Sequence, residues 1–428
     1  MNPQAEELNG IIRKNNETVF ELLSDKGKAI FFPKKGILGQ SADAKGKKIN
    51  ATIGIALEED GSPMRLKSIA KRIKLNPTEI FPYAPSFGKP ELREKWKELI
   101  YQKNPSLQGK GISLPVTTNA LTHGLSMLGY LFINPKEKII MPDRFWGNYR
   151  IIFENAYDAE FDLFKTFNEK ENGFNIDGLK EKLEGEKCKK IVLLNFPNNP
   201  TGYAPTEKEA EEIIAAIKKA AEKGNKLVVI LDDAYFGLVY KKGIYTQSLF
   251  SELADMHQNV LAVKVDGATK EDYVWGLRVG FLTSAVKGGT KELYEALESK
   301  TAGAVRGNIS NDSNLSQSLV YHALNDAKYW SEKKKKHGLL KKRYKAVEKT
   351  LKEHKEYREE FLPLPYNSGY FMCIKLVKDP EKVRQLLLNK YSTGVIAVND
   401  GLRLAFSSVP TDQIPYLFEN IYKACKEL

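Results

Sequence analysis

A chain of 428 residues is longer than one ordinary hydrophobic core requires, so the sequence predicts two domains. The hydrophobic content of 42% and the charged content of 28% are typical of a soluble globular protein, and no apolar run approaches the ~20 residues of a membrane span. Three scattered cysteines without C-x-x-C spacing fit a reducing cytoplasm, and five histidines that never pair at H-x-x-H or H-x-x-x-H give no support to a metal site.

The N-terminal part of the chain is expected to lie apart from the main core. Residues 1–64 are rich in Gly and Lys and are predicted to join a smaller domain or to form an arm. Further on, the stretch TTNALTHGLSMLGY, residues 117–130, is predicted to open a helix.

The middle of the chain alternates strands and helices. Apolar runs at 189–196, 226–232 and 259–265 predict strands, and residues 206–224 between the first two predict a helix capped by Thr206 and Glu209. Unalternating apolar strands joined by helices indicate a buried parallel sheet, in which ligands bind beyond the carboxyl ends of the strands.

Three polar residues fall at those strand ends. Asn199 and Lys270 follow predicted strands, and Asp232 is the last residue of one. The occurrence of three polar residues at these strand ends predicts a ligand site. A single lysine in a chain this rich in lysine would not support that prediction.

The densest positive charge lies in residues 331–360. Its lysines alternate with Leu340, Tyr344, Val347 and Leu351 at helical spacing, which predicts an amphipathic helix with a solvated basic face. The net charge of +12 could also attract anionic small molecules, whereas no recognition motif accompanies it and we expect no nucleic-acid partner. A strand is predicted at 367–376.

Together the segments from about Ile49 to Phe406 resemble the fold-type I, class I and II aminotransferases that use pyridoxal 5′-phosphate, in their aspartate and aromatic branch. The resemblance implies an α/β fold, with a mostly parallel central sheet, helices on both faces and a smaller α+β domain. We expect an arm with part of the small domain at 1–64, a cofactor-binding domain at 65–338 and a C-terminal small domain at 339–428.

The resemblance implies a cofactor site. Lys270 matches the lysine that forms the Schiff base, and Asp232, in LDDAYFG, matches the carboxylate beneath the pyridine nitrogen. Tyr235 and Asn199 match the donors to the ring's phenolic oxygen, and Lys270, Asp232 and Tyr235 are expected to be catalytic. Trp146, in FWGNY, matches the aromatic ring that stacks on the cofactor.

The phosphate is expected at the helix that opens near residue 120. The residues that the resemblance places on it are Ala120, Leu121, Thr122, Thr269, Arg278 and, from the neighbouring subunit, Tyr83. Two positions depart from the family. Gly267 stands where a serine or threonine is usual, and Ala120 and Leu121 replace smaller residues, so altered phosphate contacts are expected.

Substrate contacts are implied near the ends of the chain. Arg403, in GLRLAF, matches the arginine that binds the α-carboxylate, and Gly54, Trp146 and Asn199 are expected beside the substrate. Arg306 lies in a segment that crosses from the partner subunit in the resembling branch and binds a distal carboxylate.

The resemblance predicts a cytoplasmic, homodimeric aminotransferase with shared active sites. It would act on a 2-oxo acid and an L-amino acid, with dicarboxylic amino acids as the first expectation and aromatic ones as the second. A lyase or decarboxylase would need nearly the same cofactor residues. A nicotinamide-dependent oxidoreductase would need a G-x-G-x-x-G motif that the chain lacks, and a nucleic-acid-binding regulator would need an added module.

Overall fold

A seven-stranded sheet forms the centre of the computed structural model, which describes the chain except for residues 16–19, 22, 24, 31–36, 53, 73 and 186. The strand order is β2-β8-β7-β6-β5-β3-β4. The strands are β2 (Val116–Asn119), β3 (Lys138–Pro142), β4 (Glu160–Phe164), β5 (Lys189–Asn195), β6 (Lys226–Asp232), β7 (Val260–Gly267) and β8 (Val279–Ala285). Strand β8 runs antiparallel to β2 and β7, and the other pairings are parallel.

The apolar runs form the buried strands that the sequence predicts. In β6 every residue after Lys226 is buried, and it pairs with β5 and β7 along its length. The helix α10 (Glu207–Glu222) begins at Thr206, whose side chain accepts from the Glu209 amide while Glu209 accepts from the Thr206 amide. This reciprocal cap confirms the predicted helix start.

A four-stranded antiparallel sheet forms the smaller part of the molecule. Its order is β12-β13-β10-β9. The strands are β9 (Phe361–Pro363), β10 (Met372–Leu376), β12 (Ile396–Val398) and β13 (Gly401–Leu404), and α16 (Pro380–Asn389) and α17 (Ile414–Lys426) accompany them. The predicted architecture, a mostly parallel sheet with a smaller α+β part, is thereby confirmed.

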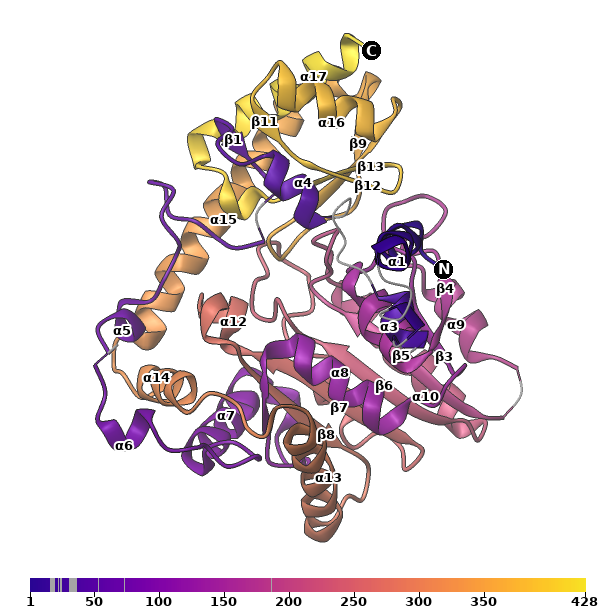
Figure 1. Ribbon diagram of the computed structural model, residues 1–428, viewed down its shortest axis with the longest axis vertical. Coiled ribbons are helices and arrows are strands. Elements are labelled where there is room, and N and C mark those ends of the chain that lie inside the picture. The colour runs from indigo at the N-terminus through magenta and orange to yellow at the C-terminus, as the bar shows by residue number, and fades with distance from the viewer. Residues whose placement is uncertain are drawn as a thin grey trace.

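Part of the N-terminal segment, α4 (Ile37–Asp43) and β1 (Ile49–Asn50), lies beside this smaller sheet, whereas α1 (Pro3–Asn15) and α3 (Asp25–Ala29) lie beside the large sheet (Figure 1). Strand β1 pairs in parallel with β11 (Thr393–Gly394). In α4, the Gln40 amide donates to the carbonyl of Ala397 at 3.1 Å and accepts from its N–H at 2.6 Å. Residues near the two ends of the chain therefore share one layer.

The basic run forms the long helix α15 (Tyr329–Glu353), which extends from beside the large sheet to the smaller one (Figure 1). Its apolar side, including Leu340, Tyr344 and Val347, is buried, so the amphipathic prediction is confirmed. The boundary predicted after residue 338 falls inside α15, and the division of the chain at 64 and 338 stays a prediction.

The predicted strand at 367–376 is shorter in the structure, beginning at Met372. Residues before it are held differently, because the Asn367 side chain accepts from the N–H of Ala204 and donates to its carbonyl.

The other helices are α5 (Lys67–Ala70), α6 (Pro77–Ile80), α7 (Pro90–Lys103), α8 (Ala120–Phe132), α9 (Ile176–Leu183), α11 (Phe250–Leu253), α12 (Ala268–Glu271), α13 (Lys291–Ile309) and α14 (Asn314–Leu324). Within the described part of the chain, no helix is both long and apolar enough to span a membrane.

Candidate active site

One cavity of about 350 Å³ collects most of the predicted site residues. It lies where β5, β6 and β7 end. The predicted residues that line it are Gly54, Ala120, Leu121, Thr122, Trp146, Asn199, Asp232, Tyr235, Thr269, Lys270, Arg278 and Arg403. Residues that the sequence did not single out also line it: Ser41, Thr52, Asn148, Asn195, Ala234, Trp275 and Phe371.

Lys270 lies three residues beyond β7, in the single-turn helix α12. Burial lowers the pKa of its amine to about 8, although the nearby Asp232 carboxylate acts to raise it. Its Nζ lies 5.0 Å from the centre of the Tyr235 ring. A lysine with a lowered pKa is partly neutral near pH 7, and the neutral amine is the nucleophilic form.

Asp232 is the last residue of β6 and is held by donors. Its Oδ2 accepts from the Tyr149 hydroxyl at 2.5 Å, and its Oδ1 accepts from the Ala234 amide at 3.1 Å. Burial raises the pKa of this carboxyl, while the hydroxyl of Tyr149 and the charge of Lys270 act in the opposite direction. The arrangement can present a fixed negative charge to a cationic ring nitrogen.

Tyr149 is a contact that the sequence reasoning missed. The ring of Trp146 meets it edge-on, with the centroids 5.7 Å apart. The sequence carried no local signal for it, because the bond between Tyr149 and Asp232 joins residues 83 positions apart.

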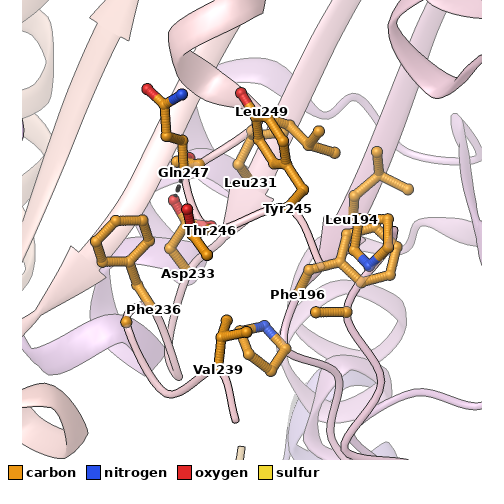
Figure 2. A pocket seen from close by; sticks show the side chains of 15 residues that line it. Leu194, Phe196, Leu231, Asp233, Phe236, Val239, Tyr245, Thr246, Gln247 and Leu249 are labelled. Carbon is orange, nitrogen blue, oxygen red and sulfur yellow. Dashed lines mark hydrogen bonds between the residues drawn. The ribbon is translucent and has the colours of Figure 1, made fainter. Parts of the chain in front are cut away.

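The neighbouring carboxylate, Asp233, points away from this cavity. It pairs with the Lys264 ammonium, accepts from the Ser248 hydroxyl at 2.6 Å, and lines a separate cavity of about 20 Å³ (Figure 2). Successive side chains of a strand face opposite sides of a sheet, so only one of the two aspartates reaches the larger cavity.

Arg403, on β13, is a buried cation that faces the cavity. It is 3% exposed, its Nη2 donates to the carbonyl of Thr52 at 3.0 Å, and its Nη1 lies 3.4 Å from Oδ1 of Asn199. Its guanidinium lies 4.3 Å over the Phe371 ring. Among the described residues no carboxylate pairs with it, and its Nε has no partner. A buried guanidinium without an acidic partner suits an anionic ligand.

The start of α8 forms a second anion-binding element. The Ala120 amide donates to the Arg278 carbonyl at 2.9 Å, which places the first turn of α8 beside Arg278. Thr269 is buried nearby with an unpartnered hydroxyl. Free amides at a helix start, a guanidinium and an unpartnered hydroxyl fit a phosphate group.

The backbone at Ala120, Arg278 and Gly267 shapes the proposed phosphate loop. Ala120 and Arg278 both adopt left-handed backbone, with φ of 59° and 56°. A Cβ at Gly267 would lie 2.6 Å from the Val279 carbonyl and 3.2 Å from Cδ1 of Leu121. The serine or threonine usual there would therefore have no room, which explains the departure at Gly267.

Tyr83 and Arg306 do not line the cavity of their own chain. Tyr83 is 91% exposed, and Arg306 is exposed in the last turn of α13. Their segments meet at the surface, where the Ser86 hydroxyl donates to the Ser310 carbonyl at 2.7 Å. In the described residues, no group of three His, Cys, Asp or Glu side chains could hold a metal ion.

Comparisons with known proteins agree with this geometry. The family model for aminotransferase class I and II matches residues 46–421. The mitochondrial aspartate aminotransferase of Schizosaccharomyces pombe is 24% identical over 392 residues, which are 89% of this chain and 85% of that protein.

Solved structures also match. An aminotransferase from Anaerococcus prevotii superposes with a TM-score of 0.82 at 24% identity, covering 94% of this chain and 99% of that one. An aromatic amino acid aminotransferase from Burkholderia cenocepacia has a TM-score of 0.73 at 20% identity, with coverages of 93% and 98%.

Proposed function

Because the chain belongs to the aminotransferase class I and II family, whose members use pyridoxal 5′-phosphate, we propose that its cavity transfers an amino group between an L-amino acid and a 2-oxo acid. The observation that carries the proposal is the meeting of Lys270, Asp232 and Arg403 in one cavity. These residues supply an amine of lowered pKa, a fixed carboxylate and an unpaired buried guanidinium.

Each cavity residue has a proposed role. Lys270 links covalently to the cofactor, and Asp232 pairs with its ring nitrogen. Tyr235 and Asn199 bond the phenolic oxygen, and Trp146 stacks on the ring. The phosphate is held by Ala120, Leu121, Thr122, Thr269 and Arg278, and the substrate by Arg403, Gly54, Trp146 and Asn199.

The chemistry depends on holding the substrate and moving one proton. When bound, pyridoxal phosphate supplies an aldehyde that takes the amino group and a ring that withdraws electrons. Arg403 orients the substrate by its α-carboxylate. The Lys270 amine, set free when the substrate amine binds, would take the proton from the substrate α-carbon as a base and give it up again as an acid. Water would supply the oxygen of the 2-oxo acid that leaves, the amino group would stay in the site, and a second 2-oxo acid would reverse the path.

Borohydride reduction tests the covalent link. The reduced cofactor should be found on Lys270 by peptide mapping, and a location on another lysine would overturn the assignment. A panel of amino acids should convert the cofactor to its amine form, and 2-oxo acids should restore it. Turnover without that conversion would instead indicate the alternative, a lyase or decarboxylase.

The preferred substrate is proposed to be dicarboxylic, with aromatic amino acids as the second class. Arg403 and a partner-derived Arg306 would bind the two carboxylates. Relatives named aspartate aminotransferase and an aromatic amino acid aminotransferase of similar fold support this choice. Arg306→Ala should lower kcat/KM for aspartate and glutamate by ~10²-fold or more and leave neutral amino acids nearly unaffected. Wild-type turnover of neutral amino acids alone would contradict the substrate assignment.

We propose a homodimer with shared sites, because the exposed Tyr83 and Arg306 lie on adjoining surface segments.

The three cysteines are free, as expected in a reducing compartment, and we propose the cytoplasm as the location. Cell fractionation would test it.

A further inference from the structure

A buried group of charged side chains lies behind the turn that carries the reactive lysine. Glu271 and Asp272, which follow Lys270 directly, are 3% and 1% exposed. They meet two cations from distant helices, Lys103 at the end of α7 and Lys333 on α15. We define the ionic clamp as Lys103, Glu271, Asp272, Tyr329 and Lys333.

The contacts of the ionic clamp are short and interlocked. Lys333 Nζ lies 2.6 Å from Oε1 of Glu271 and 3.0 Å from Oδ1 of Asp272. Lys103 Nζ lies 2.9 and 3.1 Å from the two oxygens of Glu271. The Tyr329 hydroxyl donates to Oδ1 of Asp272 at 2.7 Å. Two cations thus face two carboxylates.

Both lysines keep Glu271 ionised. Burial alone would raise the pKa of this carboxyl, but the charges of Lys103 and Lys333 and their hydrogen bonds lower it to about 2. The ion pairs of Glu271 are therefore present at neutral pH.

Such a cluster is a poor means of stabilising a fold. Buried ion pairs often give no more stability than apolar side chains of the same size, because charges lose their hydration. The clamp does fix position, since α12 has only four residues and a single turn cannot hold its own shape. The Tyr370 hydroxyl adds a bond of 3.0 Å to the Lys270 carbonyl.

We propose that the ionic clamp positions the Lys270 amine for proton transfer, with Glu271 and Lys333 as positioning residues. The inference rests on the proposed function, in which Lys270 is the lysine that reacts.

Helix α15 extends this arrangement to the substrate side of the cavity. Ten residues after Lys333, the fully buried Arg343 donates to the carbonyl of Ser407, four residues beyond Arg403. One helix thus anchors both the lysine-bearing turn and the segment that carries the carboxylate-binding arginine.

The test compares Lys333→Met and Glu271→Gln with the parent holoenzyme. Each change removes a charge at nearly constant side-chain length. The matched control is Lys349→Met on the same helix, where Lys349 makes an exposed pair of 3.8 Å with Glu353. We expect kcat to fall by about 10²-fold in both clamp variants while KM for the amino acid stays that of the parent, since misplacement of about 1 Å has that effect. The control should match the parent.

A second readout separates positioning from support of the fold. Lys333→Met removes a positive charge beside the turn and should raise the pH midpoint of the cofactor absorbance band. Glu271→Gln removes a negative charge there and should lower that midpoint. Asp232 and Arg278, which also act on Lys270, are unchanged in all variants. A lower melting temperature with unchanged kcat and midpoint would overturn the proposal.

Two further measurements keep the outcome clear. If Lys333→Met does not fold, Tyr329→Phe removes only a hydroxyl, which donates to Asp272 and accepts from Lys333 at 3.1 Å, and it should still lower kcat at parental KM. An unchanged kcat in that variant would overturn the proposal. Peptide mapping after borohydride reduction should find the cofactor on Lys270 in every variant. Its presence on another lysine would overturn the proposed function, and with it the clamp's role.

Discussion

At the scale of single residues, burial raises the pKa of Asp232 and the Tyr149 hydroxyl acts to lower it. Tyr149→Phe removes the hydroxyl bonded to Oδ2, so burial should raise the pKa of the carboxyl further. We expect kcat/KM to fall by about 10-fold, corresponding to a charge-assisted bond of ~1.5 kcal/mol. Because the ionised carboxylate is the active form, the acid limb of the pH profile should move to higher pH.

Tyr203→Phe is the matched control for this prediction. Tyr203 is another buried tyrosine bonded to a carboxylate, Glu209, at 2.7 Å, and it does not line the cavity. Its loss should leave the pH profile unchanged. An unmoved acid limb in Tyr149→Phe would show that this hydroxyl does not control Asp232.

Replacing the two adjacent aspartates should have different effects, on catalysis for Asp232 and on stability for Asp233. Asp232→Ala should abolish most catalysis, whereas Asp233→Ala leaves the buried Lys264 ammonium with only Asp266, 3.4 Å away. Removing one partner of a buried pair costs about 3–5 kcal/mol, so urea unfolding should find Asp233→Ala strongly destabilised. Equal losses of activity per folded molecule would contradict the assignment of Asp232 as the cofactor carboxylate.

The lowered pKa of Lys270 predicts a pH-dependent cost to the cofactor-free fold. Burial lowers the pKa from 10.5 to about 8, so below pH 8 the folded protein must bury a charged amine. Between these values the unfolded chain binds more protons, and stability rises with pH. Lys270→Met should therefore exceed the parent in stability at pH 7, and the gain should vanish by pH 10.5. Urea unfolding of both cofactor-free proteins checks this, and a constant difference would contradict it.

Residues at the strand ends could be predicted, but their supporting contacts could not. Asn199, Asp232 and Lys270 follow recognisable apolar runs. Tyr149 bonds to Asp232 and Phe371 lines the cavity, each from another element, and only the packing of the whole chain brings them there. The roles of Asn199, Asp232 and Lys270 in binding the cofactor or substrate stay predictions.

At the scale of elements, the contact between β8 and the start of α8 is expected to control the proposed phosphate site. A Cβ at Gly280 would lie 2.7 Å from the Ala120 carbonyl carbon and 2.9 Å from the Thr118 hydroxyl. Gly280→Ala should displace the first turn of α8, weaken cofactor binding by about 10-fold or more and cost ~1–3 kcal/mol of stability. Titration of the cofactor-free protein measures the first effect.

Gly276→Ala provides the control, because no atom lies within 4 Å of a Cβ there. It should bind the cofactor as the parent does. Equal affinity in the Gly280 and Gly276 variants would mean that the close approach of β8 does not shape the site.

Elements with a strong local signal were predictable. Strand β6 matches its apolar run, and α10 begins at its capping box. The direction of β8 was not predictable, because an apolar run does not indicate whether a strand is parallel or antiparallel. The strand at 367–376 was predicted too long, because the Asn367 bonds to Ala204 are made across 163 residues.

At the scale of the whole molecule, shared sites can be tested by mixing inactive variants. Lys270→Ala and Arg306→Ala should each be inactive toward dicarboxylic substrates. In a hybrid dimer with shared sites, one site would keep both native residues, so activity should reappear. The measurement is turnover of aspartate after subunit exchange. Exchange without recovery would indicate that each site is built within one chain.

The pairing of β1 with β11 has a consequence for synthesis. The strands of the large sheet lie within Val116–Ala285, whereas β1 must wait for β11: the Lys48 amide, next to β1, donates to the Ser392 hydroxyl, next to β11, which is synthesised 344 residues later. At roughly 5–20 residues per second, this wait lasts roughly 20–70 s. The large sheet can therefore close on the ribosome while the N-terminal segment still lacks its partner. During this interval Ile49 and Ala51 of the nascent chain are exposed to chaperones and proteases. Both residues are buried in the folded protein.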